Sequence, residues 1–199
     1  MIVVSSQSPL NKEAATINAM FDNGLKLLHI RKPDATVKEL RHLIAGIDLQ
    51  NYHQLALNQH HEIASDYGIK RLHFKEVERL KQSERQLNSL KQNGYMLSTS
   101  VHSWESYEAL TPMFSYAFIG PVFNSISKEG YNAMKHIESG GNSTVKRIAI
   151  GGISKENLDS KILKAFDGVA VLGSIWLSGE PLKEFKLLQQ KWTTAGRQF

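Results

Sequence analysis

The 199-residue sequence contains no cysteine, which excludes disulfide bonds and thiolate metal sites. No apolar run approaches the roughly 18 residues that a membrane-spanning helix needs, so we expect no membrane partner. The first four residues have no basic flank and no small-residue cleavage site, and we expect no signal peptide. A chain without cysteine is compatible with a reducing compartment, and we expect a cytoplasmic protein.

The formal net charge of +5 suggests an anionic partner. Lysine and arginine are spread along the chain, with no arginine-rich arm and no mixed aromatic and basic RNA-binding motif. We therefore expect no nucleic-acid partner. A basic protein that handles small phosphate esters would have the same charge, and we favour small phosphorylated molecules as partners.

Short apolar runs alternate with longer segments of helical period along the whole chain. No linker or low-complexity tract interrupts them, so we predict one domain over residues 1–199. The predicted strands are residues 2–5, 25–30, 54–57, 71–74, 96–100, 116–119, 147–150 and 168–172. The predicted helices are residues 11–23, 36–49, 76–93, 104–110, 155–165 and 174–192.

Strands that alternate with helices favour an α/β fold with a parallel sheet. Eight units of about 25 residues lie near the lower size limit of a (β/α)8 barrel. An open doubly wound sheet would give the same alternation, but residues 5–9 after the first strand contain no glycine-rich dinucleotide turn. We therefore predict a single-domain TIM (β/α)8 barrel, in which the chemistry lies at the C-terminal ends of the strands.

Two glycine turns follow the last two predicted strands. Gly151 and Gly152 follow residues 147–150, and Gly173 and Ser174 end the next strand. Barrels often bind phosphate with these two loops and the N-terminus of a short helix, where unpaired N–H groups face the anion. A simple chain reversal at Gly151 and Gly152 is the alternative. The second turn at the expected strand favours the phosphate site.

Polar side chains also follow the strand at residues 25–30. His29 and Arg31 lie two residues apart, so both should point into the barrel. A guanidinium is costly to bury unless it meets an anion or a partner charge. We expect Arg31 to bind phosphate, and an ion pair across the barrel is the alternative.

The loop after residues 116–119 carries Ser125, Ser127 and Lys128. Two hydroxyl groups and an ammonium at this spacing suit a phosphate or pyrophosphate. A solvated loop would have a similar composition, but the neighbouring phosphate site favours binding.

Three histidines, His29, His73 and His102, lie at neighbouring strand ends and could suggest a metal site. A catalytic metal site of this kind would normally add a carboxylate and a close His-x-His pair, and neither is present. We therefore do not expect a histidine-bound metal. Asn58 and Ser100 complete the polar residues at these strand ends.

Together these segments resemble the thiamine-phosphate synthase family, which also includes thiazole tautomerases. GPVFNSISK at residues 120–128 resembles the family's GP(V/I)(F/Y)xTxTK, and AIGGI at 149–153 resembles its IGGI loop. GVAVLGSI at 168–175 resembles GV(S/A)VISAI, and SVH at 100–102 resembles SxH. The similarity runs from about residue 25 to the end of the chain.

The resemblance implies a transferase that joins a pyrimidine-methyl diphosphate to a thiazole phosphate, giving thiamine phosphate and pyrophosphate. It implies that Mg2+ and cationic groups hold the diphosphate as it leaves. The catalytic residues that it implies are Arg31, Ser100 and Lys128. The substrate-binding residues are His29, Asn58, His102, Ser125, Ser127, Gly151, Gly152, Gly173 and Ser174.

Several positions depart from the family pattern. The family's QxRxK reads HIRKP from His29, and its Asn-Asp pair reads Asn58-Gln59. The family has a second metal-binding aspartate after an HLG motif, and its position falls near Glu78. The HLG motif itself reads HFK in this chain, so Lys75 stands in place of the glycine. Gln59 and Glu78 would therefore be the metal ligands. We expect them to bind Mg2+ weakly, because Mg2+ prefers anionic oxygen ligands, and Lys75 would replace part of its charge.

Two other functions remain open. A thiazole tautomerase needs neither diphosphate nor metal, and His102 or His29 would be its base. That enzyme typically has a histidine where this chain has Pro121. A barrel that only binds a thiazole or thiamine phosphate is the third hypothesis. We favour the synthase, and the sequence leaves the oligomeric state open, with a homodimer as one option.

Overall fold

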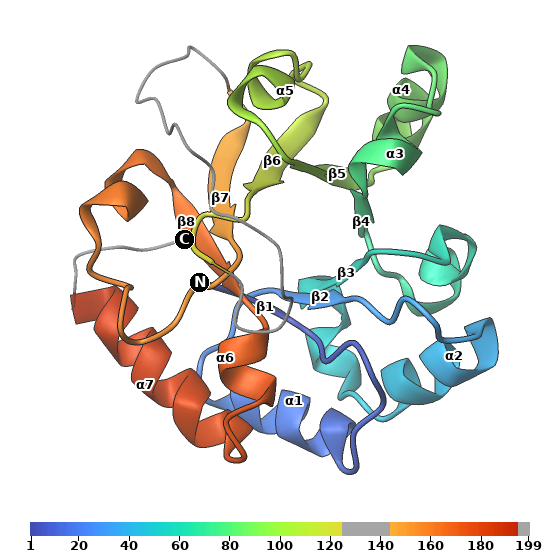
Figure 1. Cartoon of the computed structure of the whole chain (residues 1–199). Coiled ribbons are helices and arrows are strands. Elements are labelled where there is room, and N and C mark those ends of the chain that lie inside the picture. Colours follow the sequence, from blue (N-terminus) through green and yellow to red (C-terminus); the bar gives the residue numbers. More distant parts are fainter. Residues whose placement is uncertain (125–143, 195–199) are drawn as a thin grey trace.

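The computed structural model describes residues 1–124 and 144–194 and contains a closed barrel of eight parallel strands (Figure 1). Each strand pairs with the next in sequence, and the last pairs with the first through Val3 and Val171. The predicted TIM barrel is therefore confirmed. The strands are β1 (Ile2–Val4), β2 (Leu28–Ile30), β3 (Leu55–Leu57), β4 (Arg71–Phe74), β5 (Met96–Val101), β6 (Phe114–Ile119), β7 (Lys146–Ile150) and β8 (Gly168–Val171).

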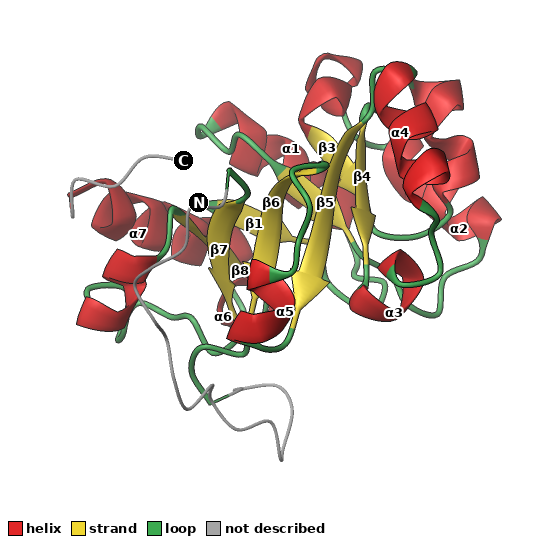
Figure 2. Cartoon of the chain, turned by 90° about the horizontal axis from the view of Figure 1, so that it is seen from above, coloured by secondary structure: helices red, strands yellow, loops and turns green. Residues whose placement is uncertain are grey.

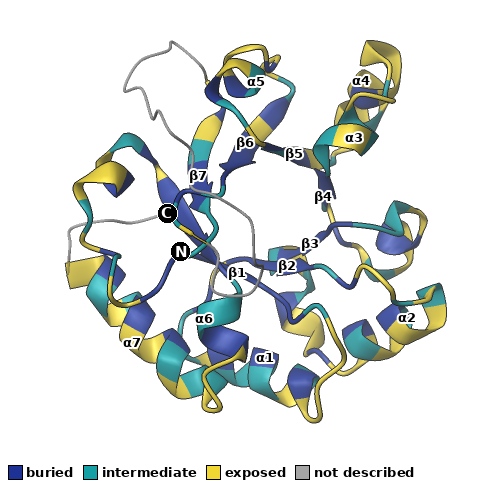
Figure 3. Ribbon diagram, in the orientation of Figure 1, coloured by how far each residue is buried: buried dark blue, intermediate teal, exposed yellow. Residues whose placement is uncertain are grey.

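Helices surround this ring, with buried faces toward the strands and exposed faces outward (Figure 3). The α-helices are α1 (Glu13–Asp22), α2 (Val37–Ala45), α3 (Glu76–Arg79), α4 (Glu84–Gln92), α5 (Trp104–Glu108), α6 (Gly173–Trp176) and α7 (Pro181–Thr194). Short 3-10 helices are η1 (Leu49–Gln54), η2 (His61–Tyr67) and η3 (Lys161–Ala165). None of the helices in the described ranges has the length and apolarity to cross a membrane.

Several predicted helices are wrong in extent. Residues 76–93 form two helices, α3 and α4, because Ser83 starts the second one: its hydroxyl accepts from the Gln86 amide at 3.3 Å. Residues 174–192 are divided into α6 and α7 by Gly179, at φ +77°, and by Pro181 at the start of α7.

Two further segments contain much less helix than predicted. The helix predicted over residues 36–49 ends at Ala45, before Gly46. Residues 155–165 contain only η3, since the chain before it turns with the Ser154 amide donating to Asn157 Oδ1 at 3.0 Å. Both segments still cover the outer face of the ring, so the shorter helices do not change the barrel.

The barrel has two distinct packed regions. The larger one lies between the strands and the helices and consists of aliphatic and aromatic side chains such as Leu28 and Leu188. The smaller one fills the ring with side chains of alternate strand residues, including Ile2, Tyr116 and Phe118. His29 and His73 stack on Phe118 with ring centroids 4.6 and 4.7 Å apart, so this interior is partly polar.

The segments that leave β6 and β7 stay in close contact. The Val122 amide donates to Ile150 O at 2.9 Å, and the Phe123 amide donates to Gly151 O at 3.1 Å. A Cβ on Gly152, at φ +65°, would lie 2.8 Å from Phe123 Cβ and would also overlap Asn124 O. The glycine pair therefore has a structural role, because only residues without a side chain allow these two loops to touch.

Gly152 and Gly68 provide a matched test of this close approach. Their φ angles are +65° and +63°, but a Cβ on Gly68 would meet nothing within 4 Å. We expect Gly68→Ala to lower the unfolding free energy by about 1–2 kcal/mol through backbone strain alone. Gly152→Ala should cost at least about 2 kcal/mol more in urea titrations because of the clash. Equal losses in the two variants would mean that the β6 and β7 loops separate without cost, and would refute a structural role for Gly152.

Candidate functional site

A cavity of about 610 Å3 opens at the C-terminal rim of the barrel, and all eight strands or the loops after them line it. The short helices α3, α5 and α6 lie at this end of the sheet (Figure 2). Predicted site residues that line the cavity are Arg31, Asn58, Glu78, Ser100, His102, Gly151, Gly152, Gly173 and Ser174. Ser125, Ser127 and Lys128 lie outside the described residues.

His29 does not line the cavity, because its ring is fully buried in the barrel beneath it. His29 Nδ1 lies 2.9 Å from Asn58 Oδ1, and Nε2 lies 2.6 Å from the Tyr116 hydroxyl. An amide oxygen can only accept, so Nδ1 carries the proton and Tyr116 donates to Nε2. The Asn58 Nδ2 group makes no hydrogen bond to any described residue, so this donor is available to a ligand.

His73 links the same interior to the other side of the cavity. Its Nδ1 lies 2.9 Å from Ser98 Oγ, and its Nε2 lies 2.8 Å from Ser100 Oγ. The His29 and His73 rings meet edge to face, with centroids 5.0 Å apart. The two histidines therefore fix the side chains of Asn58 and Ser100 from below.

Burial keeps both histidines neutral. Desolvation lowers the pKa of His29 to about 3 and lowers the pKa of His73 well below its usual value. Desolvation also raises the pKa of Tyr116 to about 12, so its hydroxyl keeps the proton that it donates. The floor of the cavity thus carries no charge at neutral pH.

Arg31 and Lys32 have different environments. Arg31 lines the cavity, and its guanidinium makes no ion pair or side-chain hydrogen bond within the described part of the chain. Burial lowers its pKa, and the nearby Asp34 opposes that shift. Lys32 is buried, with Nζ 2.5 Å from Glu13 Oε2 and 2.9 Å from Ser8 O. Of these two neighbouring cations, Arg31 is therefore the one available to a ligand, and Lys32 is structural.

The residues at the predicted metal positions already have other partners. Gln59 Nε2 donates to Lys32 O, and its Oε1 accepts from the Lys32 amide at 3.3 Å. Glu78 Oε1 lies 3.5 Å from Lys75 Nζ, and Oε2 accepts from the Lys75 amide at 3.4 Å. Over residues 1–124 and 144–194 no group of three His, Asp or Glu side chains could hold a metal ion. These donors do not fit Mg2+.

The two glycine turns lie at one rim, as the phosphate hypothesis requires. The backbone N–H groups of Gly152, Gly173 and Ser174 make no hydrogen bond to any residue that the structure describes. Ser174 Oγ is also buried without a partner in that part of the chain. The turn at Gly152 is held by Asn157 Nδ2, which donates to Gly152 O at 2.8 Å. Free amide donors in a cavity can bind an anionic oxygen.

Other parts of the site escaped prediction. Tyr116 orients His29, and its strand position two residues before Phe118 was the signal for an inward side chain. Lys81 lines the cavity from beyond α3, and nothing in the sequence indicated that this segment covers the rim. His102 donates from Nδ1 to Gly120 O at 3.2 Å, so its other ring nitrogen, Nε2, is the hydrogen-bond acceptor of the neutral ring.

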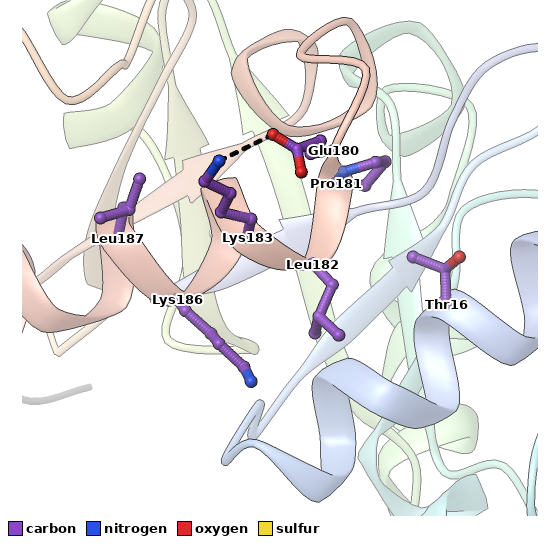
Figure 4. Close-up of a pocket in the computed structure, with 7 residues that line it drawn as sticks. All are labelled: Thr16, Glu180, Pro181, Leu182, Lys183, Lys186 and Leu187. Carbon is purple, nitrogen blue, oxygen red and sulfur yellow. Dashed lines mark hydrogen bonds and ion pairs between the residues drawn. The ribbon is translucent and has the colours of Figure 1, made fainter.

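A second hollow of about 590 Å3 lies between α1 and α7 (Figure 4). Its lining comes from Thr16 and the start of α7, where Lys183 pairs with Glu180 at 2.8 Å. Neither a histidine nor a glycine turn is among the described residues that line it. The rim cavity is therefore the stronger candidate for chemistry.

Comparison with known proteins agrees with this arrangement. The sequence model described as thiamine monophosphate synthase matches residues 1–175. The chain belongs to this family. A thiamine-phosphate synthase from Streptococcus suis is 29% identical over 102 residues, and one from Anoxybacillus flavithermus is 34% identical over 86 residues. These matches span 48% and 40% of this chain but only 44% and 39% of the relatives' own lengths.

Solved structures show the same fold over nearly the full length of the chain. The superposition with a thiamine phosphate pyrophosphorylase from Bacteroides thetaiotaomicron covers 97% of each chain, with a TM-score of 0.75 and 21% identity. One from Pyrococcus furiosus covers 98% of this chain and 95% of its own, with a TM-score of 0.73 and 18% identity. At this identity the likeness establishes the barrel alone.

The buried histidines predict a specific loss of stability in acid. His29 and His73 are neutral when folded but titrate near about pH 6.5 when unfolded, so the unfolded state binds more protons below that pH. The unfolding free energy should therefore fall as the pH drops from 6 to 5, by up to about 1.4 kcal/mol per pH unit for each histidine.

Urea titrations at several pH values would measure this slope. His29→Gln introduces the residue typical of the family. It should reduce the slope of unfolding free energy against pH by the contribution of one histidine, up to about 1.4 kcal/mol per pH unit. His53→Gln changes an exposed histidine and should keep the wild-type slope. A wild-type slope in His29→Gln would mean that His29 is protonated in the folded protein.

Proposed function

We propose that the protein is a thiamine-phosphate synthase that joins a pyrimidine-methyl diphosphate to a thiazole phosphate and releases pyrophosphate. The family match over residues 1–175 supports this reaction class. The observation that carries the proposal is that an unpaired guanidinium and free backbone amides line one cavity. The reaction requires such a pair of anion sites, one for each phosphorylated substrate.

In this proposal the diphosphate lies beside Arg31 and Asn58, with Lys128 as a further cation. The bond between the pyrimidine methyl carbon and the diphosphate oxygen breaks, and the oxygen keeps both electrons. The guanidinium and the Asn58 Nδ2 donor stabilise the negative charge that develops on this oxygen. Ser100, which His73 holds at 2.8 Å, would assist as a hydroxyl donor.

The thiazole phosphate would bind to the amides of Gly152, Gly173 and Ser174. Its ring nitrogen then attacks the methyl carbon, and the new carbon–nitrogen bond gives thiamine phosphate. The neutral floor supports this step, because an imidazolium at His29 or His73 would repel a cationic carbon above it. No step of this sequence uses a metal, since Gln59 and Glu78 do not fit one.

The cellular setting forms part of the same proposal. A cysteine-free chain is suited to the cytoplasm, where both substrates would be small phosphorylated molecules. The homodimer stays a prediction.

The first experiment is a direct assay with the pyrimidine diphosphate and the thiazole phosphate, with formation of thiamine phosphate as the readout. Saturable binding of thiazole phosphate without formation of product would refute the synthase and support a protein that only binds the thiazole phosphate. Turnover of thiazole carboxylate phosphate without metal would instead identify a tautomerase with His102 as the candidate base.

Replacement of the unpaired guanidinium should affect the chemical step. We expect Arg31→Gln to lower kcat about 100-fold or more through loss of leaving-group stabilisation. Arg41→Gln is the matched control, because Arg41 is half-exposed, pairs with Asp66 and does not line the cavity. An unchanged kcat in Arg31→Gln would refute the placement of the diphosphate.

The segment that carries Ser125, Ser127 and Lys128 provides an independent test. Lys128→Ala should lower kcat by weakening the stabilisation of departing pyrophosphate, with the same assay as the readout. Lys38→Ala, on the exposed face of α2, should retain the wild-type rate. A wild-type rate in Lys128→Ala would show that this loop is an ordinary solvated loop.

A further inference from the structure

On the diphosphate side of the cavity, the oxygen atoms at the predicted metal positions already have other partners. Asn58 Oδ1 accepts from His29, and the Gln59 amide is bound to both backbone groups of Lys32. Glu78 is the remaining carboxylate at a metal position, and it pairs with Lys75 at 3.5 Å. A metal ion at these positions would have to compete with all three sets of interactions.

The same side of the cavity carries an excess of cationic side chains. Arg31, Lys75 and Lys81 line it together with two carboxylates, Glu76 and Glu78. Glu76 pairs with Arg79 at 3.5 Å, and Glu78 pairs with Lys75. Within the described residues Arg31 and Lys81 make no ion pair, although Asp34 lies near enough to Arg31 to act on its charge. These groups are positioned for an anionic ligand.

Lys75 can change partners at little cost. Its side chain and that of Glu78 are 45% and 40% exposed, and an exposed ion pair of this kind contributes little to stability. Lys75 directly follows β4, and Asn58 directly follows β3, the strand that pairs with β4. Lys75 lines the same cavity as Arg31 and Asn58.

We propose that Lys75 and Lys81 replace Mg2+ as the counter-charge of the diphosphate, so that this site binds pyrophosphate without a divalent metal. Two ammonium groups carry the same formal charge as one Mg2+, and lysine is a common phosphate-binding point charge. The inference rests on the proposed function for the identity of the diphosphate substrate. The metal-free mode of binding follows from this chain's own side chains.

Calorimetric titration with inorganic pyrophosphate tests the proposal on the intact protein. We expect saturable binding in EDTA, and excess Mg2+ should change the affinity for total pyrophosphate by less than about 3-fold. Binding that requires Mg2+, or that Mg2+ tightens 10-fold or more, would overturn the proposal.

Three variants and one control, all measured in EDTA, test the role of each side chain in pyrophosphate binding. Lys75→Gln and Lys81→Gln should each weaken pyrophosphate binding about 10-fold and reduce its dependence on salt. Lys38→Gln on α2 is the control with unchanged affinity. Glu78→Gln separates the two models: it should tighten binding or leave it unchanged, because it removes a competing carboxylate. A loss of binding in Glu78→Gln that Mg2+ levels modulate would identify Glu78 as a metal ligand and overturn the proposal.

The outcomes also separate metal-free binding from the proposed function. Thiamine phosphate formed only with Mg2+ would confirm the synthase and overturn metal-free binding. Pyrophosphate bound in EDTA through Lys75 and Lys81, without formation of thiamine phosphate, would support the site and refute the synthase. Product formed in EDTA would support both.

Discussion

The hydrogen-bonded closure between β1 and β8 is the constraint on which the site depends. Once eight parallel strands form a ring, all their C-terminal ends must meet at one rim. Arg31 and Ser174 are 143 positions apart in the chain, yet they line the same cavity. An open sheet would spread these strand ends along a line, and the guanidinium and the amides of Gly173 and Ser174 would not face a common space.

The polar interior is the second determinant, and it is unusual for a region that barrels fill with branched aliphatic residues. Buried imidazoles are tolerated because each ring nitrogen of His29 and His73 has a hydrogen-bond partner within 2.9 Å. Such a network costs more than an aliphatic core when it is incomplete, so its members constrain one another. Its two ends are Asn58 and Ser100, so the ordering in the core extends to the cavity surface.

The barrel could be predicted because its signal is repeated: eight apolar runs at a spacing of about 25 residues leave few alternatives. The helices were harder, since the interruptions depend on single residues, such as Ser83 as a cap and Gly179 at positive φ. The cavity-lining turns were found from their glycines. The partners of Lys32 and Gln59 were out of reach, because Glu13 and the Lys32 backbone become neighbours only after the chain folds.

The departures from the family pattern form a consistent set in terms of charge. In that pattern two aspartates and one Mg2+ contribute no net charge beside the diphosphate. Here a neutral Gln59 and the Lys75–Glu78 pair contribute no net charge, and Lys81, which lines the same cavity, adds one positive charge. Loss of one carboxylate alone would leave a metal site too weak to fill, whereas loss together with two lysines preserves the attraction for an anion. The hydrogen bond from His29 to Asn58 Oδ1 acts in the same direction, because it occupies the amide oxygen and leaves the amide Nδ2 as a donor for an anion.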